Sequence, residues 1–292
     1  MFKKACSILL VFVLSCGGFG SIGFAAENDT NSNSVDVSPI DVSPIVNEAV
    51  FDLSSLGVIE GDENGNMNLS SHMTRAEFAK VAVNLTGADE GIASYSGNSK
   101  LYDVPNDYWG RGYIGYAIDR GIMSGDGDGY FRPEANITLA ECIKTLVNIM
   151  GYEVVAKEKG GYPEGYYNVA RSKHIMDSVT GRETDSAVRR DIVVLVYNAL
   201  DVPNLVINYY SEAEYREDTK ETILTIIEKA KNLYSQTGIV TAYLTTWLKA
   251  PIEALEKNQV EIDGTIYDSN IENLGKYIGQ EVRIYYKQTD NM

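Results

Sequence analysis

The stretch GDGDGYFRPEANITLAE, residues 125–141, decides how this chain folds. Its glycines predict a tight turn, because glycine adopts positive-φ backbone conformations that other residues resist. Its end predicts the start of a helix, because Thr138 and Glu141 have the spacing of a capping box. In that motif the threonine hydroxyl accepts a hydrogen bond from an amide of the first helical turn, and the glutamate accepts one from the threonine amide. We therefore expect a glycine turn, a proline loop and a capped helix, in this order.

The same pattern occurs twice more along the chain. Thr74 and Glu77 lie 64 residues before Thr138 and Glu141, and a weaker copy 50 residues further on has Val188 in place of the threonine. Each copy has an asparagine seven residues after its acidic position; these are Asn84, Asn148 and Asn198. Three matches in register indicate an internal repeat.

Three sequence blocks resemble the S-layer homology (SLH) domain, a module of bacterial cell-surface proteins. They are GDGDGYFRPEANIT at 125–138, MTRAEFA at 73–79 and LYDVPNDYWGRGYIGYAIDRGI at 101–122. The chain is thereby identified as an SLH domain-containing cell-surface protein of the Gram-positive type, with the resemblance covering residues 46–203. The resemblance implies three modules packed as one helical bundle with a pseudo-threefold arrangement. A single module is too small to bury its apolar faces alone.

The whole chain is expected to be an α+β protein built from several segments. These are a signal peptide (1–26), a linker (27–45), SLH modules (46–87, 101–152 and 161–203) and a C-terminal helix and β region (204–292). The first helices of the first and third modules are expected over 47–56 and 165–173. Gly57 and Gly121 should close the first helices of their modules, and His174 takes that position in the third.

The first 26 residues have the features of a secretory signal peptide. Lys3 and Lys4 precede an apolar run at 8–14, and small residues follow up to Ala25-Ala26. A lipoprotein signal with a lipidated Cys16 is the alternative interpretation. No later run approaches the ~20 apolar residues of a membrane span. We therefore expect a secreted protein of the cell wall or surface layer.

The charge of the chain limits its partners. A formal net charge of −16 argues against nucleic acid and anionic membranes, because both would be repelled. The hydrophobic content of 44% argues for a folded protein rather than a disordered one.

The composition changes after residue 204. A helix is expected over 221–235, and β-strands over 238–244, 260–267 and 282–286. Within the second of these runs, Asp263-Gly264 predicts a hairpin turn.

The sequence carries no recognisable catalytic motif, and we expect a non-enzymatic protein without a metal or cofactor. It has two histidines and no Gly-x-Ser-x-Gly elbow. The glycine turn does not fit a calcium loop, because Ser124 and Ala135 stand where carboxylate ligands are needed. A carboxylate pair for glycoside hydrolysis stays open, although none of the 41 acidic residues is singled out. Cys142 is expected to be a packed core thiol.

Two arginines suggest where a ligand binds. Arg75 and Arg189 share a repeat position in the first turn of their helices, where a cation opposes the helix dipole. An anion held between the helix N-terminus and the guanidinium would explain this choice. Ion pairing with a neighbouring acidic side chain is the alternative. The second copy has Leu139 at this position, so its groove should be weak or differently built.

The resemblance also implies what the grooves between modules bind. The expected partner is secondary cell wall polysaccharide, a peptidoglycan-linked glycan that bears pyruvate ketals. The expected ligand-binding residues are Arg75, Arg189, Arg190, Asp103, Trp109 and Gly125, and the structural caps are Thr74, Glu77, Thr138 and Glu141. Trp109 has a second interpretation as a packing anchor.

The expected function is non-catalytic attachment to the bacterial wall. The alternative is a surface-layer scaffold or assembly protein whose C-terminal region binds other surface-layer proteins.

Overall fold

The computed structural model describes residues 13–14, 43–88, 91–92, 95, 101–179, 181–182, 184–207, 215–217, 225–248, 255–269, 271 and 273–287. The chain divides into two compact units, Val37–Lys231 and a second that joins Met1–Asp36 with Asn232–Met292. Most of the predicted signal peptide, including Cys16, and the linker up to residue 42 lie outside the described residues.

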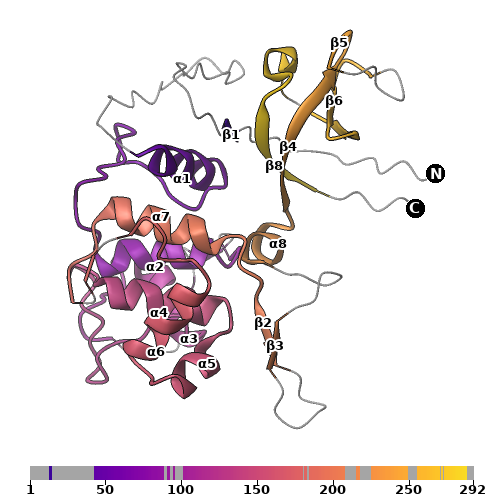
Figure 1. Ribbon diagram of the computed structural model, residues 1–292. Coiled ribbons are helices and arrows are strands. Elements are labelled where there is room, and N and C mark those ends of the chain that lie inside the picture. The colour runs from indigo at the N-terminus through magenta and orange to yellow at the C-terminus, as the bar shows by residue number, and fades with distance from the viewer. Residues whose placement is uncertain are drawn as a thin grey trace. The chain divides into compact units, whose positions relative to one another are not determined.

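The unit Val37–Lys231 is mainly helical (Figure 1). Its elements are α1 (Pro44–Ser55), α2 (Arg75–Asn84), α3 (Arg111–Asp119), α4 (Leu139–Ile149), α5 (Glu153–Glu158), α6 (Glu164–Ser172), α7 (Arg189–Ala199), β2 (Leu205–Ile207), β3 (Tyr215–Glu217) and α8 (Ile226–Lys231). Helix α1 packs against α7, α2 against α3, and both α4 and α5 against α6. Strands β2 and β3 form an antiparallel hairpin that the sequence did not predict.

The two predicted capping boxes are present. The amide of Glu77 donates to the Thr74 hydroxyl at 3.2 Å, and the amide of Thr74 donates to the Glu77 carboxylate at 2.8 Å. Thr138 and Glu141 make the same pair of bonds, at 3.3 and 2.9 Å. Val188 begins α7 without a side-chain cap. Two helix starts therefore follow directly from a local sequence motif.

The three predicted closing turns are also present. Gly57, Gly121 and His174 end α1, α3 and α6 in the left-handed region, with φ of 67°, 68° and 59°. The amide after each turn residue donates back into the helix, as in a Schellman motif. These bonds run from Val58 to Leu53 (2.8 Å), Ile122 to Ala117 (2.8 Å) and Ile175 to Ala170 (2.9 Å).

The repeated asparagines connect the two helices of each copy. The side-chain amides of Asn84 and Asn148 donate to the carbonyls of Gly57 and Gly121, at 3.2 and 3.3 Å. Asn198 donates to the carbonyl of Ile175 at 3.0 Å. Each asparagine thus holds the closing turn of the helix before it.

A closed ring of backbone hydrogen bonds joins the three copies. It uses Met73, Ile137 and Ala187, the residues directly before the three helix caps, and all three side chains are buried. The amide of Ile137 donates to Met73 at 3.0 Å, that of Ala187 to Ile137 at 2.8 Å, and that of Met73 to Ala187 at 3.4 Å. Because each copy donates to one neighbour and accepts from the other, no copy forms this contact alone.

Helix α1 begins at Pro44, three residues before the predicted start at Asn47. Proline suits the first helical position, because its fixed φ matches the helix and no hydrogen bond is lost there. The amide of Val46 already donates to Ser43 at 2.8 Å. The helix therefore includes Pro44 and Ile45, which the sequence had assigned to the linker.

The packing-anchor interpretation of Trp109 is wrong, because this residue is 53% exposed. Helix α3 begins only at Arg111, so Trp109 lies before this helix. The chain turns at Gly110, where a Cβ atom would lie 2.9 Å from the ring of Tyr108. The buried residues of α3 are Gly112, Ile114, Gly115 and Ala117. The short helix α5 was not predicted either.

The second unit contains an antiparallel sheet with the strand order β1-β8-β4-β6-β7, and β5 also pairs with β4. The strands are β1 (Val13–Leu14), β4 (Tyr234–Tyr243), β5 (Thr246–Trp247), β6 (Gln259–Ile262), β7 (Thr265–Asp268) and β8 (Glu281–Tyr286). The predicted hairpin joins β6 to β7 through Asp263-Gly264, with φ of 46° and 81°. Two positive φ angles match the turn that suits twisted strands.

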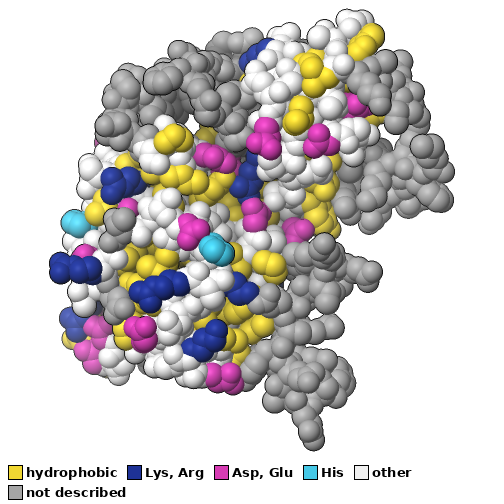
Figure 2. All heavy atoms as spheres, viewed as in Figure 1, with side chains coloured by type: hydrophobic (Ala, Val, Ile, Leu, Met, Phe, Trp, Pro, Cys, Tyr) yellow, Lys and Arg dark blue, Asp and Glu magenta, His cyan; other side chains and the backbone are white. Residues whose placement is uncertain are grey.

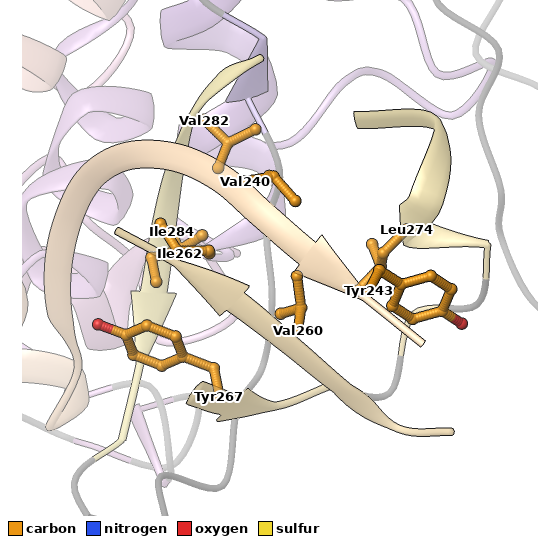
Figure 3. Close-up of a cluster of buried hydrophobic side chains, with 8 residues drawn as sticks. All are labelled: Val240, Tyr243, Val260, Ile262, Tyr267, Leu274, Val282 and Ile284. Atoms are coloured by element: carbon orange, nitrogen blue, oxygen red, sulfur yellow. The ribbon is translucent and has the colours of Figure 1, made fainter. Parts of the chain in front are cut away.

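The core of this sheet is a single apolar cluster (Figure 3). It consists of Val240, Tyr243, Val260, Ile262, Tyr267, Leu274, Val282 and Ile284. Leu274 comes from the 3-10 helix η2 (Leu274–Tyr277), and the other side chains come from β4, β6, β7 and β8. The mixture of helices and an antiparallel sheet confirms the predicted α+β class.

The predicted helix over 221–235 is shorter in the structure, and its first four residues lie outside the described ranges. Helix α8 begins at a capping box of Thr225 and Glu228 that the sequence analysis missed. It ends before Asn232, whose φ of 52° is incompatible with a helix, and Tyr234 already starts β4. In the described part of the chain, no helix has the length and apolar character needed to cross a bilayer.

Candidate ligand-binding site

A small pocket lies where the first and second copies meet, and Tyr162 of the third module also lines it. Its volume is about 160 Å³, and its lining residues are Arg75, Ile122, Met123, Ser124, Gly125, Asp126, Glu141, Lys144, Thr145 and Tyr162. We refer to it as the Arg75 pocket. It brings together two of the predicted ligand-binding residues, Arg75 and Gly125.

Arg75 is buried and holds the second copy against the first. Its guanidinium forms an ion pair with Glu141 and donates to the carbonyls of Phe131 (2.8 Å) and Ser124 (2.9 Å). It also lies 4.7 Å from the centroid of the Phe131 ring. The residue is only 5% exposed. These contacts show that Arg75 positions the pocket wall, in agreement with the ion-pairing alternative.

The first helical turns have their donors occupied. The amides of Arg75, Leu139 and Arg189 donate to carbonyls of the neighbouring copy at 2.9, 3.1 and 2.8 Å, and the acceptors are Ala135, Asp185 and Ser71. In α2 and α4 the capping threonines accept the amide of the third helical residue. The place predicted for an anion, between helix end and guanidinium, is therefore filled by backbone carbonyls.

Lys144 is the cation of the pocket that remains available. Its Nζ lies 3.5 Å from the Ser124 hydroxyl and 5.5 Å from the centroid of the Tyr162 ring. Within the described ranges it forms no ion pair with a carboxylate, whereas Glu141 is paired with Arg75 and Asp126 with Arg132. The pocket therefore has one positive charge that its own acidic residues do not neutralise.

Gly125 is required by the backbone of the turn. A Cβ atom at this position would lie 2.7 Å from the carbonyl oxygen of Tyr130, which is closer than real contacts allow. The amide of Asp126 donates to that same carbonyl at 3.0 Å. Gly61, at the same repeat position, has the same constraint from the carbonyl of Gly65, at 2.6 Å. Only glycine therefore fits at this position of the turn that forms one wall of the pocket.

The other predicted ligand-binding residues lie outside the pocket lining. Asp103 accepts the amides of Phe131 and Arg132 at 2.9 and 2.6 Å, which fixes the segment after the glycine turn. Arg189 donates to the carbonyl of Glu60 at 2.8 Å. Arg190 is exposed and lies 3.4 Å from the carboxylate of Asp191. Trp109 stacks at a tilt on Tyr108, with 5.7 Å between the ring centroids.

The sequence analysis missed Lys144 and Tyr162, the unpredicted cationic and aromatic side chains of the pocket lining. The repeat offset of 64 gives a signal for the first, because it aligns Lys144 with Lys80 and Ser124 with Glu60. In the first copy Lys80 is paired with the Glu60 carboxylate at 2.7 Å. A serine in place of that glutamate predicts an unpaired lysine.

The acidic side chains and the thiol of the described residues are the kinds of group that could hold a metal ion or act as a nucleophile. On the face shown in Figure 2, acidic and basic side chains are interspersed and neither sign forms a separate surface. No group of histidine, cysteine, aspartate or glutamate in the described residues could hold a metal ion. Cys142 is buried, which raises the pKa of its thiol well above the ordinary value and keeps it protonated.

The repeats, the closed backbone ring and the small pocket define a class of helical repeat modules, and comparison with known proteins identifies the class. The family described as S-layer homology domain matches residues 41–79 and 100–142. The "Middle cell wall protein" of Brevibacillus brevis is 31% identical over 173 residues, which are 59% of this chain and 16% of that protein.

Two further relatives have names of the same kind. The "Surface layer protein" of Brevibacillus choshinensis is 26% identical over 209 residues, covering 70% of this chain and 17% of that protein. The "Cellulosome-anchoring protein" of Acetivibrio thermocellus is 31% identical over 83 residues, covering 28% of this chain and 19% of that protein. The chain thus spans less than a fifth of the length of each of these three relatives.

Two regions of the chain match the SLH domain, and its relatives are named as cell-wall and surface-layer proteins, which supports a location at the cell wall or cell surface. The matched family and the names of the relatives support attachment to the cell surface or a role in a surface layer. They also suggest a structural or anchoring protein rather than an enzyme.

Proposed function

We propose that this protein attaches non-catalytically to the bacterial wall by binding secondary cell wall polysaccharide, with a pyruvate ketal of the glycan in the Arg75 pocket. The observation that carries the proposal is the ammonium group of Lys144, which faces the pocket without an ion-pair partner among the described residues. A carboxylate is the complementary ligand, because a charge-assisted hydrogen bond is stronger than a neutral one.

The size of the pocket agrees with a substituent rather than a whole sugar chain. A volume of about 160 Å³ is well below the ~300–1,000 Å³ of pockets that enclose a complete small ligand. The carboxylate of the ketal enters the pocket and bonds to Lys144, while the sugar ring stays at the mouth. Tyr162, which is 53% exposed, offers the ring an aromatic surface there.

In this proposal Arg75 is a positioning residue. Its donors are directed to Glu141 and to the carbonyls of Phe131 and Ser124, so they fix the wall beside Lys144. The three SLH modules form one domain with a pseudo-threefold arrangement, and the closed ring through Met73, Ile137 and Ala187 supports it. An isolated second module, residues 101–152, should therefore fail to unfold cooperatively in denaturant, since it lacks both neighbours.

The test compares two lysines at the same repeat position. Lys144→Met keeps the length of the side chain and removes the charge, and should weaken binding of pyruvylated wall polysaccharide by about 10- to 100-fold in calorimetric titration. Lys80→Met is the matched control, because Lys80 is already paired with Glu60. Polysaccharide from which the ketal has been removed should bind the wild type as weakly as it binds Lys144→Met. Unchanged affinity in a folded Lys144→Met protein contradicts the proposal.

A second candidate function is scaffolding, in which the C-terminal unit binds other surface-layer proteins. The observation that favours it is an exposed apolar hairpin in this unit: Leu244, Trp247 and Leu248 are 37%, 46% and 60% exposed. Segment 238–248 contains no charged residue. Wall pull-down distinguishes the two functions. Retention of residues 43–207 alone on purified wall supports attachment, whereas retention that requires the C-terminal unit supports scaffolding.

A further inference from the structure

Two tyrosine rings lie on the surface of the second copy and touch each other. Tyr102 is 77% exposed and Tyr130 is 40% exposed, and their centroids are 5.6 Å apart. Rings that remain in water contribute little to folding, because the hydrophobic effect depends on apolar area that is removed from water. Their place on the surface therefore needs another explanation than packing.

Backbone hydrogen bonds fix the segments that carry the two rings. The amide of Tyr102 donates to the carbonyl of Gly129 at 2.9 Å. Gly129 has a φ of 89°, which favours glycine, and a Cβ atom there would lie 2.6 Å from the Tyr102 ring and would displace it. The Asp103 carboxylate accepts the amides of Phe131 and Arg132, which ties the segment of one tyrosine to that of the other.

Arg132 lies next to the Tyr130 ring. Its guanidinium lies 6.0 Å from the centroid of the Tyr130 ring and is paired with Asp126 and, at 3.6 Å, with Asp128. Its backbone has a φ of 58°, a conformation that costs a non-glycine residue free energy. In the first copy the same position holds Asn68, a residue type that tolerates this conformation better. The arginine thus occupies this position at a cost in backbone free energy.

We propose that Tyr102 and Tyr130 form an aromatic shelf that binds a neutral saccharide ring. The shelf supplies a rigid, exposed aromatic face for the C–H face of a sugar, and tyrosine does so at low cost in conformational entropy. Asp126, Asp128 and Arg132 at its edge supply acceptors and donors for hydroxyl groups. The charges select the ligand class, because two carboxylates to one guanidinium disfavour an anionic sugar.

This proposal goes beyond the Arg75 pocket, because it requires neither a carboxylate on the ligand nor Lys144. The two features are nevertheless adjacent along the chain. Asp126 lines the pocket and also pairs with Arg132 of the shelf. The turn Gly125–Tyr130 therefore contributes residues to the lining of the Arg75 pocket and one ring to the shelf.

The experiment uses the full chain and two saccharide probes of equal length, one uncharged and one charged. The probes are the neutral trisaccharide of N-acetylglucosamine and the anionic trisaccharide of galacturonic acid, and binding is measured by saturation-transfer NMR and calorimetry. We expect the neutral probe to bind and Tyr102→Ala to weaken its binding by about 2- to 10-fold, the scale of one aromatic contact. Tyr102→Phe keeps the ring and should bind within about 2-fold of the wild type.

The control is Tyr234→Ala, which removes a half-buried aromatic side chain from the other unit and should leave the binding unchanged. Thermal unfolding of each variant verifies the fold, and Tyr102→Ala should keep it because most of the ring is in water. The proposal is overturned by undiminished binding in Tyr102→Ala, by absence of binding to the wild type, or by equal affinity for the anionic trisaccharide. Since the neutral probe has no carboxylate, its behaviour does not depend on whether the Arg75 pocket binds a ketal.

Discussion

The interface between the first and second copies and the interface between the third and first copies share one backbone arrangement. At the first, Arg75 donates to the carbonyl of Ser124 at 2.9 Å; at the second, Arg189 donates to the carbonyl of Glu60 at 2.8 Å. These donors and acceptors occupy the same repeat positions. The side chains on the acceptor residues differ, however, and that difference changes the electrostatics of the two interfaces.

At the third-to-first interface the Glu60 carboxylate binds Lys80, and the two charges cancel. At the first-to-second interface Ser124 has no charge, so Lys144 stays available beside a pocket. A repeated fold thus provides repeated backbone contacts, whereas one side chain decides whether the lysine at the interface is paired with a carboxylate of the described residues. The predictions below test this difference, beginning with the largest effect.

Replacing the buried arginine should destabilise the helical unit far more than replacing its counterpart. Arg75→Met leaves Glu141 without its partner and two carbonyls without a donor, which should cost about 3–5 kcal/mol of unfolding free energy, towards the lower value because Glu141 stays partly exposed. Arg189→Met removes one bond at an exposed position and should cost about 1 kcal/mol or less. Urea denaturation of the two variants measures the difference. Equal losses would show that burial of Arg75 does not distinguish the interfaces.

Exchanging the acceptor side chains should exchange the electrostatics. Ser124→Glu places a carboxylate beside Lys144 and is expected to weaken binding of pyruvylated polysaccharide by about 10- to 100-fold. Glu60→Ser frees Lys80 and should add a second, weaker binding event to the calorimetric titration. The same repeat position holds glutamate in the first copy and serine in the second, so folding should be retained in both variants. If Ser124→Glu binds as tightly as the wild type, Lys144 is not the residue that receives the anion.

Much of the fold could be predicted because its signals are local. The capping boxes at Thr74 and Thr138, the closing turns at Gly57 and Gly121 and the hairpin at Asp263-Gly264 each depend on a few neighbouring residues. The errors concern features that depend on distant contacts. Trp109 is a large aromatic residue of the kind that is often found in a core. The chain turns at Gly110, however, and leaves Trp109 exposed.

The candidate site was harder to predict, because the position of a residue in the repeat does not show whether its hydrogen-bond donors are already bonded to other groups of the protein. The sequence identified Arg75 but did not show that Phe131, Ser124 and Glu141, from another copy, take up its guanidinium. The same applies to the helix N-termini, whose amides are satisfied by carbonyls of the neighbouring copy. Lys144 was overlooked for the opposite reason, since no carboxylate among the described residues pairs with it.

The N-cap residues of α2, α4 and α7 should give a smaller difference in stability between the copies. Thr74→Ala and Thr138→Ala should each cost about 0.5–2 kcal/mol of stability, because each removes an N-cap acceptor. Val188→Ala removes no such acceptor and should cost less, while Val188→Thr should gain about 1 kcal/mol by adding one. Thermal and urea unfolding report these changes. Equal losses at all three alanine variants would contradict the assignment of the caps.

The smallest predicted effect concerns the glycine turns of the first two copies, which are held by different bonds. Asp126 pairs with Arg132, whereas Asp62, at the same repeat position, accepts the amides of Asn64 and Asn66 at 2.9 Å each and the side chains of Asn66 and Asn68. These bonds, chiefly the one from the Asn66 amide, lower the pKa of Asp62 below its ordinary value of 3.8. A lowered folded-state pKa means that the stabilisation is present above pH 3.8 and disappears as the pH falls through the folded value.

We therefore expect the wild type to lose stability more steeply below pH 4 than Asp62→Asn, which has no proton to bind at this position, and urea midpoints measured between pH 2.5 and 7 compare them. The effect should be small, because Asp62 is exposed and solvent screens its charge. Glu63→Gln is the control, since Glu63 accepts no such bond from the described residues, and it should follow the wild-type curve. Parallel curves for the wild type and Asp62→Asn would show that the charge of Asp62 does not stabilise this turn. The hydrogen bonds of the turn would then act through geometry alone, and the electrostatic difference between the copies would reside in Ser124 and Glu60.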